Sequence, residues 1–209
     1  MHLTAFSDHK APQAEREHVA AQDRKYSAPG TPSGSSSRSS RTAGPASGPA
    51  FIRSFQTSDK EAFRTLNEAW ISHYFALEPE DTELLSDPEA KILATGGHIF
   101  VAVAGQDKEE EVVGCFALLP LPGNTLRLAR MTVREDQRGK GVGRRLLSHA
   151  ILTAQALHAR RLVLETSGKL ESAVHLYQTA GFCFVPADAA GPRPLARADL
   201  YMELLLPGS

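Results

Sequence analysis

The sequence has few cysteines, no long apolar run and no excess of charge of either sign. Its 23 Lys and Arg face 24 Asp and Glu, so the formal net charge is −1. Without a positive field to hold a phosphate polymer, we expect no nucleic-acid partner. No apolar run approaches the roughly 18 residues that span a bilayer, and residues 1–25 have no uninterrupted apolar segment of the secretory kind. We therefore expect a cytoplasmic protein with no membrane partner.

The two cysteines, Cys115 and Cys183, both lie in apolar runs. Neither has the spacing of a metal site or of a redox pair. A free cysteine in such a run behaves as a small apolar residue. We expect both to be reduced core residues, and we expect no metal site.

Large apolar residues are concentrated after residue 50. Residues 27–50 consist of Ser, Gly, Pro, Thr, Ala and Arg alone, and such a segment cannot offset the entropy lost when it is ordered. The composition predicts a disordered low-complexity tail over residues 1–50. Residues 51–209 carry enough apolar side chains for one domain with one core.

Strand and helix patterns alternate along this domain. The first helix is predicted to start at the capping-box pair Ser58 and Glu61. Strands are predicted over 51–56, 99–104, 112–119, 125–133, 162–164, 182–185 and 199–206, and further helices over 80–94, 141–158 and 170–180. This order predicts a mixed α/β domain with a mostly antiparallel front half and a strand-helix-strand crossover behind it.

A glycine-rich segment, residues 137–143, joins a predicted strand to a long helix. A helix N-terminus exposes unpaired N–H groups, and glycines let an anion approach them closely. The spacing fits neither the Walker motif nor the dinucleotide fingerprint, because Arg144 stands three residues after Gly141. The alternative is a flexible strand-to-helix loop that happens to contain glycines. Arg138 and Lys140 favour the phosphate site.

The strand before this segment changes its apolar phase. Leu126 and Leu128 alternate in one phase, whereas Met131 and Val133 take the other. One extra residue at positions 129–130, a β-bulge, would produce this change, although chance is the alternative. A bulge leaves backbone groups unpaired, and these can bind an extended ligand that carries amides.

Two motifs in this region together resemble the GNAT superfamily of N-acetyltransferases. Arg138, Gly141 and Gly143 match the pattern Arg/Gln-x-x-Gly-x-Gly/Ala, and residues 173–182 match Ala-x-x-Leu-Tyr-x-x-x-Gly-Phe. The resemblance implies the acyl-CoA N-acyltransferase fold from residue 51 onward. In that fold a central, twisted, mostly antiparallel sheet of about seven strands is flanked by about four helices.

The resemblance also implies a cofactor site and an activity. Acetyl-CoA would be the acyl-donor co-substrate, with its thioester beside the bulged strand, where the sheet splays. The residues expected to pair with the pantetheine arm are Met131, Thr132 and Val133, and those expected to hold the pyrophosphate are Arg138, Gly139, Lys140, Gly141, Val142 and Gly143. The expected reaction is transfer of the acetyl group to a primary amine of a small molecule or protein, by direct attack on the thioester.

Tyr177 and Glu165 are the candidate catalytic residues. Tyr177 lies on a helical stripe and reads as a half-buried core aromatic from spacing alone. The resemblance makes it the general acid that protonates the departing thiolate. Many family members carry a carboxylate four residues before the position of Met131, where this chain has Arg127. This leaves the general base unassigned. Glu165 is a possible substitute base, and its alternative role is that of a structural or surface carboxylate. A water chain, or an amine substrate that is already neutral, would also serve.

The acceptor side is expected between the first two helices and the final hairpin. The acidic residues there would attract a cationic amine or would simply begin a solvated helix. They are Glu78, Glu80, Asp81 and Glu83. The loop 186–199 is long for a hairpin connection and is expected to rim the cleft. Because Arg193 and Arg197 in this loop would equally favour an anionic substrate, charge does not choose the acceptor.

Two further readings stay open from the sequence. A non-catalytic acyl-CoA-binding sensor or recruitment module is favoured by Arg127 in place of the carboxylate, and the retention of Tyr177 favours the enzyme. A nucleotide-binding α/β domain is disfavoured by the absent phosphate-loop spacings. Both a monomer and a homodimer are compatible with the sequence.

Overall fold

The computed structural model describes residues 50–105, 110–187 and 195–207. The predicted disordered tail up to residue 49 and residues 188–194 of the predicted acceptor loop lie outside the described residues. The strands are β1 (Phe51–Ser54), β2 (His98–Ala104), β3 (Glu111–Leu121), β4 (Thr125–Val133), β5 (Arg161–Thr166), β6 (Cys183–Phe184) and β7 (Leu200–Leu205). The α-helices are α1 (Lys60–Tyr74), α2 (Pro79–Ser86), α3 (Val142–Ala156) and α4 (Glu171–Thr179).

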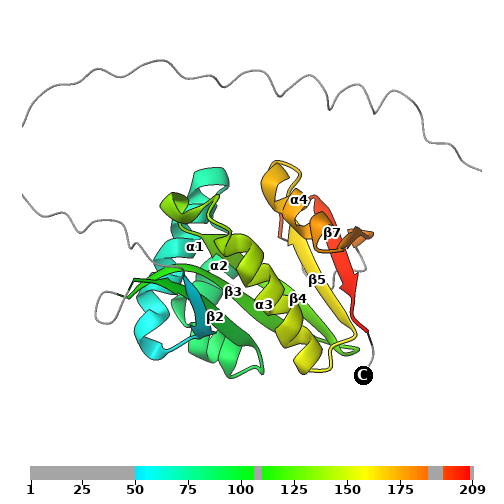
Figure 1. Ribbon diagram of the computed structural model, residues 1–209, viewed down its shortest axis with the longest axis horizontal. Helices are drawn as coiled ribbons and strands as arrows, with labels where there is room; N and C mark the ends of the chain where they lie inside the picture. Colours follow the sequence, from blue (N-terminus) through cyan, green and yellow to red (C-terminus); the bar gives the residue numbers. More distant parts are fainter. Residues whose placement is uncertain (1–49, 106–109, 188–194, 208–209) are drawn as a thin grey trace, which may run out of the picture. The chain divides into compact units, whose positions relative to one another are not determined.

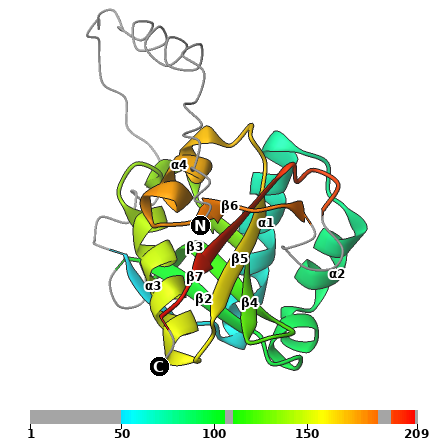
Figure 2. The same ribbon diagram turned by 90° about the vertical axis from the view of Figure 1, so that its right-hand side faces the viewer.

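The strands form one seven-stranded sheet in the order β1-β2-β3-β4-β5-β7-β6. Neighbouring strands are antiparallel except β4 and β5, which are parallel and are joined through α3. Helices α1 and α2 cover one face of the sheet and α3 and α4 cover the other (Figure 2). The predicted mixed α/β fold, with its antiparallel front half and one crossover, is confirmed.

The central strands are apolar along most of their length because both faces of the sheet are covered. Side chains alternate between the two faces of a strand. In β3, Phe116 therefore belongs to the apolar cluster that includes Leu146 of α3, whereas Cys115 belongs to the cluster that includes Phe63 of α1. The core thus consists of two layers, one on each side of the sheet.

The predicted capping pair of the first helix is displaced by two residues, because the capping box is formed by Gln56 and Asp59. A 3-10 turn, Thr57–Asp59, precedes α1. The backbone N–H of Gln56 donates to Asp59 Oδ2 at 2.8 Å, and Arg53 Nη1 donates to the same oxygen at 2.6 Å. Asp59 is 4% exposed. This buried carboxylate therefore sets the helix entry, and Glu61 instead pairs with Arg64 on the helix surface.

The predicted helix over 80–94 is interrupted. Helix α2 ends at Ser86, and a π-helical turn follows at Glu89–Leu93. Pro88 stands between them, and its ring removes a backbone donor and blocks the preceding helical turn.

The prediction that both cysteines are core residues is right for Cys115 and wrong for Cys183. Cys115 is buried and Cys183 is exposed. Phe182, one residue earlier, is 3% exposed and fills the core, so the short edge strand β6 turns Cys183 outward. Among the described residues, no helix is both long and apolar enough to cross a membrane.

Candidate functional site

A cavity of about 620 Å³ lies where the sheet opens beside β4. Within the described residues, the parallel pairing of β4 with β5 runs from Thr125 and Arg161 to Leu128 and Leu164 and stops there. Past this point the two strands diverge (Figure 1). Their diverging ends line the cavity together with α1, α4 and the turn before α3. The predicted splay of the sheet is confirmed.

The predicted β-bulge is confirmed at Arg130. Ala117 of β3 faces Ala129, but Cys115 faces Thr132, so two residues of β4 lie opposite one residue of β3. Arg130 has a φ of 54°, in the left-handed region that non-glycine residues rarely adopt. The extra residue explains the change of apolar phase, because it returns the following side chains to the layer of α3 and α4.

A short chain of hydrogen bonds from α1 through β3 holds the bulge, and sequence reasoning did not identify it. The side-chain amide of Asn67 donates to Cys115 Sγ at 3.3 Å, and Cys115 Sγ donates to the carbonyl of Arg130 at 3.6 Å. Burial raises the pKa of the Cys115 thiol to about 12, so it remains a donor. These hydrogen bonds therefore fix the backbone of the bulge.

The glycine turn bends sharply into α3. Gly139 and Gly141 have φ values of 73° and 79°, and Gly141 is the N-cap of the helix. A Cβ built on either glycine would meet no described atom within 4 Å. The turn therefore offers left-handed backbone and open space next to unpaired helix N–H groups, which is the arrangement that anions bind.

Two side chains of this turn are fixed by hydrogen bonds. Arg138 Nε donates to the carbonyl of Val133 at 3.1 Å, and Lys140 Nζ donates to Gln137 Oε1 at 3.4 Å. Val142 is 5% exposed and packs in the core, so only its backbone faces the turn.

Of the nine residues expected to contact acetyl-CoA, the six that line the cavity are Met131, Thr132, Val133, Arg138, Gly139 and Gly143. Lys140, Gly141 and Val142 lie outside its lining.

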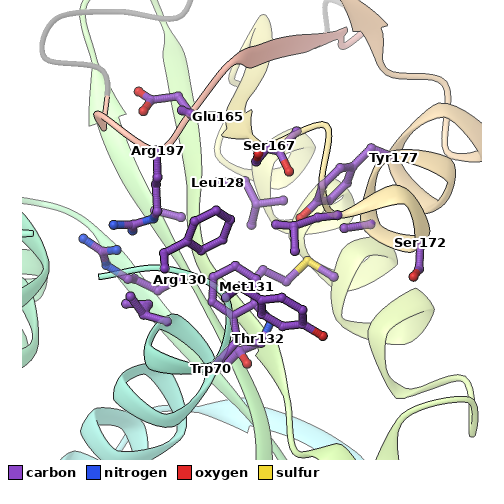
Figure 3. Close-up of a pocket in the computed structure, with 18 of the residues that line it drawn as sticks. Trp70, Leu128, Arg130, Met131, Thr132, Glu165, Ser167, Ser172, Tyr177 and Arg197 are labelled. Carbon is purple, nitrogen blue, oxygen red and sulfur yellow. The ribbon is translucent and has the colours of Figure 1, made fainter. Parts of the chain in front are cut away.

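Tyr177 reaches the cavity from α4. It is 8% exposed, packs beside Phe182 with ring centroids 5.9 Å apart, and lines the cavity (Figure 3). Burial raises the pKa of the phenol to about 12, so the hydroxyl keeps its proton at neutral pH. The two roles expected for Tyr177 are thus compatible, because its ring packs in the core while the residue also borders the cavity.

Glu165 lies on the other side of the cavity from Tyr177 (Figure 3). Its side chain is 5% exposed, so the surface reading is wrong. One carboxylate oxygen accepts from Arg127 Nη1 at 3.3 Å and the other accepts from the backbone N–H of Leu195 at 3.0 Å. Arg127 also donates to Glu80 at 3.1 Å. Glu165 is thus engaged as a structural carboxylate.

The acidic residues at the start of α2 form ion pairs, of which those of Asp81, Glu80 and Glu78 with arginine are largely buried and that of Glu83 with Lys91 is exposed. Asp81 is fully buried and contacts both Arg130 and Arg197. Burial alone would raise its pKa, but hydrogen bonds from Arg197 and the charge of Arg130 outweigh burial and lower the pKa. Glu78 pairs with Arg197 at 3.0 Å. Arginines from distant parts of the sequence therefore neutralise most of the acidic residues that were expected to attract an amine.

The side of the cavity next to α1 has an aromatic wall at the end of that helix. Trp70, Tyr74 and Phe75 line it, and the Trp70 ring lies 5.6 Å from Tyr74 and 6.1 Å from Phe75. The described part of the predicted rim loop supplies Leu195, Arg197 and Ala198, whereas Arg193 lies outside the described residues. Helical spacing alone would place these aromatic residues in the core. Nothing in the sequence indicates that they line the cavity.

Comparison with known proteins places this architecture among acetyltransferases. The chain is 30% identical to the uncharacterized N-acetyltransferase YvbK of Bacillus subtilis (strain 168) over 105 residues, which are 49% of this chain and 65% of that protein. It is 34% identical to the streptothricin acetyltransferase of Streptomyces lavendulae over 85 residues, which are 39% of this chain and 45% of that protein. The matched segments are therefore less than two thirds of these two relatives.

Solved structures share the fold. A GNAT-family acetyltransferase from Staphylococcus aureus Mu50 superposes with a TM-score of 0.68 and 22% identity, covering 76% of this chain and all of that one. YncA of Salmonella typhimurium, described as a putative acetyltransferase with its cofactor acetyl-CoA, has a TM-score of 0.57 and 22% identity over 78% of this chain and 96% of that one. The model of the acetyltransferase (GNAT) family matches residues 60–182, more than half of the chain. On this match, and with the splayed and bulged sheet that frames the cavity, the chain belongs to the acetyltransferase (GNAT) family.

Proposed function

We propose that the protein transfers the acetyl group of acetyl-CoA to a primary amine of a small molecule or a protein. The observation that carries this proposal is that the bulged strand, the glycine turn and Tyr177 border one cavity. The pantetheine arm would pair with β4 past Leu128, where β5 has parted from it. The pyrophosphate would lie at the start of α3. A phosphinothricin acetyltransferase of Sinorhizobium meliloti with the same fold was crystallised with acetyl-CoA.

The reaction needs a proton donor at the sulfur. The amine nitrogen attacks the thioester carbonyl, the C–S bond breaks, and the electron pair leaves with sulfur as a thiolate. Tyr177 would donate its proton to this thiolate, and the proton lost by the nitrogen would restore the phenol through solvent. A positioned donor of this kind lowers the barrier because thiolate is otherwise released with an uncompensated charge.

We assign Glu165 a positioning role instead of the general base. Both of its oxygens accept hydrogen bonds, from Arg127 and from Leu195, and its side chain is nearly buried. Protonating it would break a buried ion pair, which is costly. Its contacts hold the end of the acceptor loop next to β5, so it shapes the cavity in which the amine would bind.

The decisive experiment is to incubate the full chain with acetyl-CoA and a panel of amines and lysine peptides while following free thiol. Thiol release with one acceptor class supports the enzyme. Binding of acetyl-CoA without acceptor-dependent thiol release would instead favour a binding module, for which Arg127 at the usual place of a base is the supporting observation. Failure to bind acetyl-CoA would remove both functions.

Tyr177→Phe tests the proton donor. The ring and its packing remain, so acetyl-CoA affinity and melting temperature should stay near wild type, while turnover falls roughly ten- to ten-thousand-fold. Tyr201→Phe is the matched control, because its hydroxyl donates to the carbonyl of Ala198 at 3.3 Å and Tyr201 does not line the described cavity. Turnover of Tyr177→Phe within about twofold of wild type would end the general-acid assignment.

A further inference from the structure

One buried carboxylate joins the two halves of the cavity. Asp81, at the start of α2, is fully buried. One of its oxygens contacts Arg130 Nη1 and accepts from Arg197 Nη2 at 2.8 Å, and the other accepts from Arg197 Nη1 at 2.6 Å. Arg130 belongs to the bulge on β4, and Arg197 belongs to the segment before β7. The same side chain therefore holds the expected cofactor strand and the acceptor rim.

The bulge end of this link depends on the backbone conformation of Arg130. Its φ of 54° is unfavourable for a residue with a Cβ, and its side chain is 5% exposed. Nε of Arg130 is buried without a hydrogen-bond partner in the described structure, and Asp81 is the carboxylate that pairs with its Nη1, while Glu80 adds a weaker electrostatic attraction. If residue 130 left the left-handed region, its side chain would change direction and the contact with Asp81 would be lost.

At the acceptor rim, the link to Asp81 depends on Arg197. The backbone N–H groups of Ala196 and Arg197 donate to Glu78 at 2.8 and 3.2 Å, and the guanidinium of Arg197 lies 5.9 Å from the centre of the Phe75 ring. Leu195, Arg197 and Ala198 all line the cavity. Weakening the contact between Arg197 and Asp81 would loosen this segment, and its amide protons would then exchange faster.

We propose that Asp81 is a positioning residue that couples cofactor binding to the acceptor rim. Pairing of the pantetheine arm with β4 would stabilise the left-handed Arg130, Arg130 would hold Asp81, and Asp81 would hold Arg197 over the acceptor side. The inference rests on the proposed acetyl-CoA site. The acceptor rim at residues 195–198 would thus be held more firmly when the acyl donor is in place.

The coupling has a definite thermodynamic form. A ligand shifts an equilibrium only through its different affinities for the two states, which here are Arg130 on Asp81 and Arg130 released. The effect is reciprocal, so anything that holds the acceptor rim against Asp81 also tightens acetyl-CoA binding. Typical couplings between sites change an affinity by about 5- to 150-fold.

Amide hydrogen exchange tests the coupling without knowledge of the acceptor. The full chain is exchanged with and without saturating acetyl-CoA, and mass spectrometry follows two segments, residues 128–133 and residues 195–198. In the wild type, acetyl-CoA should slow exchange in both segments, by about fivefold or more at the rim. In Arg130→Gly, acetyl-CoA should slow exchange in the bulge alone, because glycine keeps the left-handed backbone but removes the link.

Two further variants sharpen the result. Arg197→Gln cuts the link at the rim, leaves Asp81 with Arg130, and gives the same prediction, so it decides the matter if Arg130→Gly does not fold. Glu83→Gln on the same helix is the control, since its pair with Lys91 is exposed and lies outside the cavity lining. This control should keep the wild-type response in both segments.

Three outcomes would overturn the coupling. The first is a wild-type bulge that slows while the rim does not change. The second is a rim that slows equally in Arg130→Gly and Arg197→Gln, which would mean that acetyl-CoA contacts the rim directly. The third is an unchanged bulge, which would also remove the proposed acetyl-CoA site. The first two outcomes leave the proposed function intact, so the two failures are distinguishable.

Discussion

Asp81→Asn should destabilise the domain far more than an ordinary surface substitution. The substitution keeps the size of the side chain and removes its charge. Arg130, at 5% side-chain exposure, would then be a buried cation that has lost its ion-pair partner. Breaking one partner out of a buried pair costs about 3–5 kcal/mol of unfolding free energy. Arg197 should add little, because it keeps Glu78 at 3.0 Å.

A second substitution separates the charge from the packing. Arg130→Gly removes the buried cation and relieves the left-handed strain, which is worth roughly 1–2 kcal/mol. The double variant should therefore be clearly more stable than Asp81→Asn alone. Two residues in direct contact couple by about 0.5–3 kcal/mol in such cycles, and we expect the upper part of that range.

Urea unfolding of the full chain, followed by far-UV circular dichroism, measures these free energies. Glu83→Gln is the control, with side chains of the pair 60% and 43% exposed, and should cost about 0–1 kcal/mol. If Asp81→Asn cost no more than this control, the buried pair would not be holding α2 to β4. A double variant no more stable than Asp81→Asn would show that Arg130 is not the uncompensated charge.

Two more predictions concern the glycine turn and acid stability. Gly141→Glu should abolish acetyl-CoA binding in calorimetric titration while the domain stays folded, because a carboxylate would stand where helix N–H groups face phosphate. Gly123→Glu is the matched control, with a φ of 75° and open space in a turn outside the cavity lining, and wild-type affinity in Gly141→Glu would contradict the assignment. The pKa of Asp81 is lowered in the fold, so its stabilisation is present above the unfolded pKa of about 3.9 and is lost as pH falls through the folded value. Thermal melts should show a smaller loss below about pH 4 in Asp81→Asn than in wild type, and equal losses would exclude Asp81 as the titrating group.

Local and periodic signals in the sequence determined the order of the elements and the position of the bulge. The change of phase between Leu128 and Met131 marked the bulge because side-chain direction has a period of two residues along a strand. The glycines marked the turn before α3 because Gly139 and Gly141 occupy left-handed backbone that other residues adopt at a cost. These signals are carried by neighbours in the chain, so no tertiary contact was needed to read them.

Features that depend on packing between elements were missed or misread. The capping pair of Ser58 and Glu61 had the right spacing, but the buried Asp59 holds the helix entry through Arg53. Cys183 stood in an apolar run, but the short edge strand β6 turned it outward. In both places a local pattern was satisfied, and the surrounding fold decided which side chain was buried.

Tertiary structure alone decided the electrostatics of the site. Asp81 meets Arg130 across 49 residues of sequence and Arg197 across 116, and Glu165 meets Arg127 across 38. Read along the chain, these residues were separate acidic and basic positions whose attraction for a substrate was undecided. Coulomb interactions depend on distance in space and on burial, and neither follows from separation along the chain. Folding therefore turned charges that appeared available to a substrate into buried pairs that hold the cavity together.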